Sequence, residues 1–162
     1  MFDKDLFCEQ IRANEKAMYH LAFSILKNDS DACEVISESI FRAYKNFETL
    51  KSIDSFKPWI LRIVHNTSIE YIRKNSMVVA LDEVEIIANN HENHVVSSIS
   101  LKEAINSLKQ PYSTVVTLYY YEGLSISQIA KITNTTIVTV KQRLSRSRKQ
   151  LRKILKEDFR YE

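Results

Sequence analysis

Apolar residues recur along this chain at intervals of three and four, the spacing that gathers them on one face of an α-helix. In the first 75 residues this pattern predicts three helices, over residues 6–26, about 31–47 and 56–74. The polar segment Asn28–Ser30 separates the first two, because its short side chains favour turns and helix caps. Pro58 marks the start of the third helix, since proline is tolerated in a first helical turn.

The second of these helices combines an apolar face with an acidic one. Asp31 and Glu34 suit a helix N-terminus, where the helix dipole favours negative charge, and their spacing resembles a capping arrangement. Glu38 lies two turns into the helix, where the dipole explains it less well. The acidic face therefore either faces solvent or docks a basic partner. The apolar residues expected to be buried are Ile36, Ile40, Ala43, Tyr44 and Phe47.

The third helix has a polar stripe made by Arg62, His65, Asn66 and Arg73. These side chains either face solvent or contact phosphates and base edges of a nucleic acid. Trp59, at the start of the same helix, is expected in the core, although it also has the shape of a wedge for DNA.

The C-terminal part of the chain has the pattern of a helix-turn-helix. Ser125 and Gln128 form a capping box at the start of a short helix. The turn Thr133–Thr136 follows, with Asn134 at a position that needs a left-handed backbone. Ile137 then opens a long helix. Two helices joined by so short a turn are typical of DNA-binding domains.

The long helix, residues 137–156, has one apolar and one hydrogen-bonding face when residues are placed at about 100° intervals. It contains eight Lys or Arg residues and no acidic residue, so a polyanionic partner is the simplest explanation of its charge. The apolar face is expected to hold Ile137, Val140, Leu144, Leu151, Ile154 and Leu155. The opposite face holds Lys141, Gln142, Ser145, Arg146 and Lys149.

Composition narrows the fold class to all-α. Gly and Pro number 1 and 2 in 162 residues, which excludes sandwiches, barrels and glycine-rich phosphate loops. No apolar run is long enough to span a membrane, and the N-terminus has no signal-peptide pattern. Cys8 and Cys33 are too few for a disulfide framework, and His91 with His94 lacks a third metal ligand. We expect no metal and no cofactor.

Charge divides the chain into segments. Residues 1–50 carry a net charge of −3, residues 76–100 carry −4, and residues 101–162 carry +7. We predict two small helical domains, residues 1–75 and 99–162, joined by a flexible acidic linker over residues 76–98. The acidic front and the basic tail indicate different partners for the two domains.

Taken together, three stretches of the chain resemble the extracytoplasmic-function sigma factors, the smallest class of the bacterial housekeeping-type sigma family. Residues 31–44, DACEVISESIFRAY, are similar to the polymerase-binding helix of that family. Residues 55–66, SFKPWILRIVHN, with YIRK at 71–74, resemble its −10 recognition helix. YEGLS at 121–125 and TVKQRLSRSR at 139–148 resemble its −35 domain. The order and spacing of the three stretches make the resemblance specific.

The resemblance implies a role for each candidate residue. It implies that core RNA polymerase binds Asp31, Glu34, Ser37 and Glu38. It implies that the −10 element contacts the loop residues Lys51, Ser52, Ile53, Asp54 and Ser55, which would hold an unstacked base, and the helix residues Arg62, His65 and Asn66. It implies that the −35 element contacts Thr139, Lys141, Gln142, Arg143, Ser145, Arg146, Arg148 and Lys149.

The family resemblance further implies a cytoplasmic, non-catalytic protein with no small-molecule substrate and with an anti-sigma partner, often membrane-anchored. One alternative from the residues alone is a helix-turn-helix repressor that acts without polymerase on a palindromic site. Another is a helical enzyme acting on DNA, for which Asp31, Glu34 and Glu38 are the only candidate carboxylate cluster.

Overall fold

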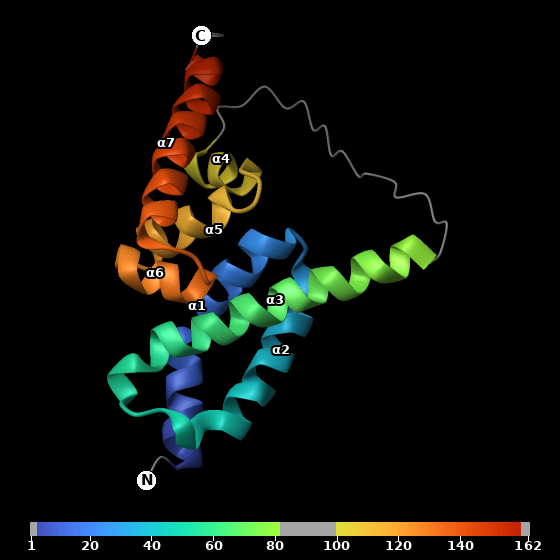
Figure 1. Ribbon diagram of the computed structural model, residues 1–162, viewed down its shortest axis with the longest axis vertical. Helices are drawn as coiled ribbons and strands as arrows, with labels where there is room; N and C mark the ends of the chain where they lie inside the picture. The colour runs from blue at the N-terminus through green and yellow to red at the C-terminus, as the bar shows by residue number, and fades with distance from the viewer. Residues whose placement is uncertain (1–2, 82–99, 160–162) are drawn as a thin grey trace.

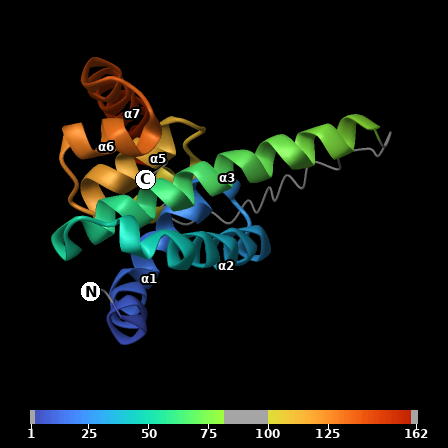
Figure 2. The ribbon, with the colours of Figure 1, turned by 60° about the horizontal axis from the view of Figure 1, so that its bottom comes forward.

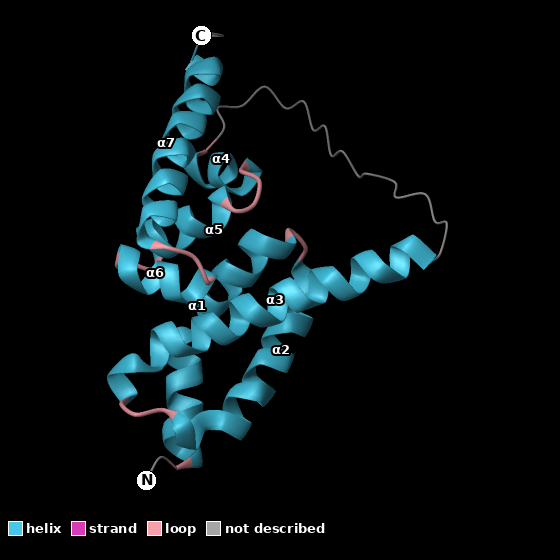
Figure 3. Ribbon diagram, in the orientation of Figure 1, coloured by secondary structure: helices cyan, strands magenta, loops and turns pink. Residues whose placement is uncertain are grey.

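The computed structural model describes residues 3–81 and 100–159, and within these ranges it contains helices and no strands (Figure 3). The elements before residue 82 are α1 (Lys4–Leu26), α2 (Asp29–Asn46), η1 (Phe47–Thr49), η2 (Ile53–Ser55) and α3 (Phe56–Leu81). Those after residue 99 are α4 (Leu101–Ser107), α5 (Tyr112–Val116), η3 (Thr117–Tyr121), α6 (Ile126–Thr133) and α7 (Ile137–Phe159). The predicted all-α class is confirmed. None of the described helices is long and apolar enough to cross a bilayer.

Helix α2 begins at Asp29, close to the expected start at about residue 31. The Asn28 side chain caps the helix by accepting a hydrogen bond from the Asp31 backbone N–H at 2.9 Å. The predicted capping by the Asn28–Ser30 segment is confirmed. Asp31 lies inside the first turn, so the spacing of Asp31 and Glu34 does not mark a capping box. The predicted break at Asn28–Ser30 is where one helix ends and the next begins.

The buried face of α2 is also rotated from the predicted one. Its buried side chains are Ala32, Val35, Ser39 and Ala43, whereas Tyr44 is 54% exposed. The prediction that Tyr44 is buried is therefore wrong. Helix α2 packs against both α1 and α3, and small residues in this row let the three helices approach closely.

Helix α3 is longer than its sequence pattern indicated, because it continues beyond residue 74 to Leu81. Its C-terminal turns extend away from the rest of the molecule (Figures 1 and 2). The first residues of the predicted linker, 76–81, are thus helical. Residues 82–99, with His91 and His94, lie outside the described residues.

The helix-turn-helix is confirmed by its local geometry. The Ser125 hydroxyl accepts from the Gln128 N–H at 3.1 Å, and the Gln128 side chain accepts from the Ser125 N–H at 3.0 Å. Asn134 has the left-handed conformation, with φ of 54°, and its N–H bonds the carbonyl of Ala130. Gly123, which joins η3 to α6, has φ of 63°, where a side chain would be strained.

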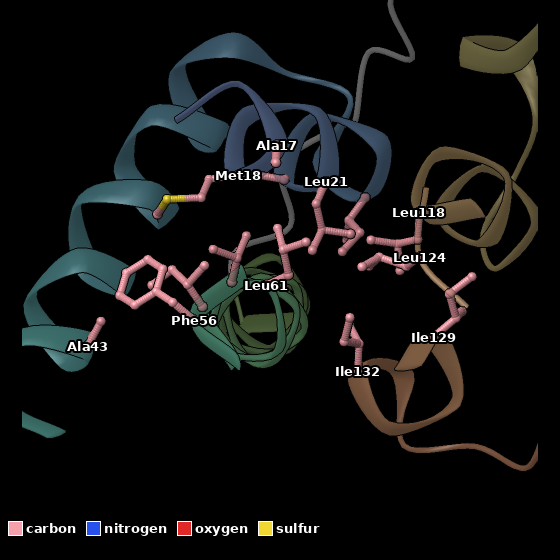
Figure 4. Packing of buried hydrophobic residues seen from close by; sticks show 14 of the residues in the cluster. Ala17, Met18, Leu21, Ala43, Phe56, Leu61, Leu118, Leu124, Ile129 and Ile132 are labelled. Atoms are coloured by element: carbon pink, nitrogen blue, oxygen red, sulfur yellow. The ribbon is translucent and has the colours of Figure 1, made fainter. Parts of the chain in front are cut away.

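The two domains share a hydrophobic core. Leu21 and Leu61 of the first domain lie in one continuous cluster with Leu118, Leu124 and Ile132 of the second (Figure 4). Helix α6 packs on α3, and α5 packs on α1. We call this packing of the two domains against each other the closed arrangement. It places the helix-turn-helix directly against α3, the helix that carries Arg62, His65 and Asn66.

Candidate nucleic-acid interface

Helix α7 presents the predicted polar face to solvent. All five of its expected members are exposed, while Val140 and Leu144 on the other side are buried in the core. The exposed members are Lys141, Gln142, Ser145, Arg146 and Lys149. The described part of this helix therefore offers a row of hydrogen-bond donors to a groove or phosphate backbone.

The first turn of α7 departs from the prediction. Ile137, expected on the apolar face, is 46% exposed, so that prediction is wrong. Val140 is the first residue of α7 that is fully buried.

Two of the other predicted −35 residues, Thr139 and Arg148, have hydrogen-bond partners within the protein. The Thr139 hydroxyl lies 2.9 Å from the Thr136 hydroxyl at the helix start. The Arg148 guanidinium donates to the Tyr120 hydroxyl at 2.7 Å. Arg143 is half-buried and lines the cleft between the two domains. These three side chains thus lie beside the exposed polar face rather than at its centre.

The predicted −10 residues of α3 face the second domain. The Asn134 side-chain N–H donates to Asn66 Oδ1 at 3.2 Å, and Arg62 donates to Asn134 Oδ1 at 3.5 Å. His65 and Asn66 line an interdomain cleft of about 660 Å³ together with Arg143. In this arrangement the second domain partly covers the surface that α3 would offer to DNA.

His65 is a half-buried titratable group in this cleft. Its Nδ1 atom is buried and has no hydrogen-bond partner among the described residues. Burial lowers the pKa of His65 below its ordinary value of 6.5, and the positive charge of nearby Arg143 lowers it further, although a hydrogen bond with Asn66 opposes the shift. The closed arrangement therefore favours the neutral imidazole.

We predict that acidification destabilises the protein through His65. Because the folded-state pKa lies below the unfolded one, the stabilisation from neutral His65 is complete above pH 6.5 and is lost as the pH falls through the folded value. Urea unfolding at pH 7.5 and at lower pH measures this. His65→Gln, which does not titrate, should show a smaller loss of stability between the two pH values. Equal losses in both proteins would contradict the role of His65.

The segment expected to be a loop that holds an unstacked base lies between η1 and α3, and its residues Ile53–Ser55 form η2. Lys51, Asp54 and Ser55 are exposed, while Ser52 and Ile53 are half-buried. Near it, Trp59 is half-buried and packs its ring 5.6 Å from that of Phe56, as expected for a core residue with an exposed edge. A hollow of about 400 Å³ beside this tryptophan is lined by Arg42, Asn46, Thr49, Trp59, Ile63, Asn66, Thr67 and Glu70.

Of the predicted polymerase-binding residues, Glu34, Ser37 and Glu38 line a hollow of about 610 Å³ between α2 and α3. Glu34, Ser37 and Glu38 are exposed, and Asp31 accepts a hydrogen bond from the Tyr71 hydroxyl at 2.8 Å. The Ser37 hydroxyl donates to the backbone carbonyl of Cys33. Some side chains of the acidic face are thus exposed to solvent, and others are hydrogen-bonded within the protein.

Arg42 joins this acidic face to α3 and was not among the predicted site residues. Its guanidinium lies 2.9 Å from Glu38 and 2.7 Å from Glu70. The hydrogen bonds to Glu38 and Glu70 raise the pKa of Arg42, so the charge stays in place. The four-residue spacing of Glu38 and Arg42 was a visible signal in the sequence, whereas Glu70 could only be placed by the tertiary structure.

Glu122 makes a second contact between the domains that the sequence analysis did not single out. Its carboxylate, only 8% exposed, lies 3.3 Å from Lys57 Nζ and 3.1 Å from His20 Nδ1. Within the described ranges no group of three or more His, Cys, Asp or Glu residues is placed to hold a metal ion.

Comparison with known proteins places the chain in a family. Residues 10–77 match the sigma-70 region 2 family, and residues 98–151 match the family described as sigma-70, region 4. The RNA polymerase sigma factor SigV of Bacillus subtilis is 34% identical over 96% of this chain and 95% of its own length. The ECF RNA polymerase sigma factor SigW of the same organism is 32% identical over 96% of this chain and 91% of its own length.

Solved structures share the fold. The sigma factor RpoE in complex with the anti-sigma factor NepR, from Bartonella quintana, has a TM-score of 0.78 at 23% identity and covers 95% of this chain and 98% of its own. CnrH in complex with the cytosolic domain of CnrY has a TM-score of 0.68 at 18% identity, over 96% and 91% of the two chains. Sequence and fold agree, and the chain belongs to the extracytoplasmic-function (ECF) sigma factors of the sigma-70 family.

Proposed function

We propose that this chain binds core RNA polymerase through the acidic face of α2 and reads a promoter with both domains. The first domain would open the −10 element with α3 and the loop at residues 51–55, and the second would read the −35 element with α7. The observation that carries this proposal is the separation of charge. Exposed carboxylates gather on α2, and an exposed, acid-free row of donors gathers on α7.

Promoter binding of this kind requires the two domains to move apart. Arg62 and Asn66 hydrogen-bond to Asn134 in the closed arrangement, and DNA would have to replace those partners. Such exposed polar contacts are weak, because water competes for them, so phosphates and base edges can replace these hydrogen bonds. Opening would also expose apolar side chains of the core that the two domains share, and this is the larger cost. Polymerase, by holding the domains at two separate places, would stabilise the open form.

A sigma factor acts where polymerase and promoter meet, so we propose a cytoplasmic location and no catalytic chemistry of its own. Relatives of the same fold were solved with anti-sigma factors bound. We extend this to a proposed anti-sigma partner, of the membrane-anchored kind that often regulates the class. Such a partner would cover the polymerase-binding and DNA-binding faces.

Size-exclusion chromatography with bacterial core RNA polymerase at moderate salt tests the proposal. A stoichiometric complex that then selects promoter DNA is expected. A helix-turn-helix repressor would instead bind a palindromic operator without polymerase. If the folded protein forms no complex with the polymerase, the proposed function is wrong.

Charge reversal on α2 tests the docking face separately. Glu38→Lys removes an exposed carboxylate and repels Arg42, and we expect affinity for core polymerase to fall by about 1 kcal/mol, roughly fivefold. Titration of labelled protein with core polymerase measures this. Glu15→Lys makes the same charge change at an exposed position of α1 and should leave the affinity unchanged. Equal losses for both variants would mean that only net charge matters.

A further inference from the structure

The first turn of α7 carries an exposed apolar side chain on an otherwise polar surface. Val138 is 63% exposed, although it belongs to the helix whose polar face is expected to meet DNA. Single apolar residues on a surface are common and need no special explanation. Val138, however, lies on the same helix face as residues that are expected to contact bases.

Val138 stands in the same row as the residues expected to face bases. Lys141, Gln142 and Ser145 follow it by three, four and seven positions, which places all four side chains on one helix face. All four are exposed. Ile137 precedes Val138 by one position and so points about 100° away from this row. Val138 is therefore the N-terminal member of the row, whereas Ile137 lies to its side.

The hydrogen-bonding groups next to Val138 are already used by the helix start. The Thr136 hydroxyl accepts from the Thr139 N–H at 3.1 Å and also contacts the Thr139 hydroxyl. At this end of the helix, Val138 contributes two methyl groups and no hydrogen bond. Its β-branched side chain gains nothing in helix propensity over a polar residue, and its exposure shows that it adds little to the core.

The position of Val138 and its apolar side chain together suit contact with the methyl group of thymine. The N-terminal residues of a recognition helix reach the base edges of the major groove. There, only thymine presents a methyl group, and apolar side chains read thymine by packing on it. Guanine and cytosine, and the edge of adenine, present polar groups that a valine cannot satisfy.

Building on the proposed function, we propose that Val138 is a specificity-determining residue that packs on the 5-methyl group of a thymine in the −35 element. The contact is a van der Waals one and adds to the hydrogen bonds made by the polar members of the row. It gives the −35 element a thymine preference at the position that faces the start of α7.

A comparison of thymine with uracil tests the methyl contact directly, because uracil differs only by that group. The full chain, assembled with core polymerase, first selects its −35 element from a randomised pool. Each thymine of the selected element is then replaced by uracil in turn. At one position the wild-type affinity should fall by about threefold to fivefold, as expected for the loss of one buried methyl group.

The variants are compared by their thymine-to-uracil affinity ratio, which does not depend on the active concentration of each preparation. Val138→Ala should bring the ratio at that position close to one, whereas Val138→Thr, which keeps one methyl group, should retain part of it. Ile137→Ala is the matched control, since it shortens the neighbouring exposed side chain, and should leave the ratio unchanged.

Two results would overturn the proposal while leaving the proposed function intact. One is a selected element in which no uracil substitution weakens binding. The other is a thymine-to-uracil affinity ratio for Val138→Ala that equals the wild-type ratio. This result would count against the proposal even if Val138→Ala also bound core polymerase more weakly. Failure of the wild-type complex to select any −35 sequence would reject the proposed function, and with it the role of Val138.

Discussion

Leu118→Ala is expected to lower the free energy of unfolding by about 2–5 kcal/mol, the usual range for a leucine truncated in a well-packed core. Leu118 belongs to the second domain, and its side chain is fully buried in the cluster that includes Leu21 and Leu61 of the first (Figure 4). The cavity would therefore open at the place where the domains meet. Both domains should lose stability together.

Trp59 makes this prediction measurable, because it is the single tryptophan of the chain and lies in the first domain. In the wild type, unfolding followed by Trp59 fluorescence should coincide with unfolding followed by far-UV circular dichroism. In Leu118→Ala both transitions should move to lower denaturant concentration. Leu118→Met, which nearly conserves volume, should shift them much less. A fluorescence transition that stays in place would show that the two domains unfold independently.

The helix-turn-helix was predictable from sequence because its signals are local. A capping box at Ser125, a left-handed turn at Asn134 and an acid-free row beginning at Lys141 each occupy a few neighbouring positions. Local chemistry decided each of them, and the tertiary structure did not override it. The exposed row on α7 follows directly from the same spacing.

The contacts between the domains were not predictable, because each joins positions far apart in the sequence. Glu122 is an ordinary exposed acid by its local pattern, yet it lies buried beside Lys57. Asn134 was identified as a turn residue, but its side chain also bonds Asn66 of α3. Tyr44 was misplaced for a related reason, since the packing of α2 on two neighbours decides which side of that helix is buried.

Arg146 should contribute most to −35 recognition among the exposed residues of α7. Its side chain is exposed, and it makes no hydrogen bond or ion pair with any other described residue. The guanidinium is therefore free to bond a guanine edge through two parallel donors, the commonest specific contact between a side chain and a base. Lys149, one turn further along, is better suited to a phosphate, because its ammonium has no planar fork.

Arg146→Ala is expected to weaken binding to the preferred −35 element by about 1–3 kcal/mol and to relax base preference at one position. The measurement is promoter affinity of the polymerase complex, with the −35 element varied one base at a time. Lys149→Ala should weaken binding to all sequences about equally and reduce the salt dependence, as the loss of a phosphate contact does.

Arg146→Lys separates charge from geometry at the same position. Lysine keeps the positive charge but cannot reproduce the bidentate fork, so this variant should hold the salt dependence near that of the wild type and still lose most of the base preference. If Arg146→Lys instead keeps the full preference while Arg146→Ala loses affinity for every sequence equally, Arg146 binds phosphate. The polar contacts to bases would then come from Lys141, Gln142 and Ser145, which are exposed on the same helix.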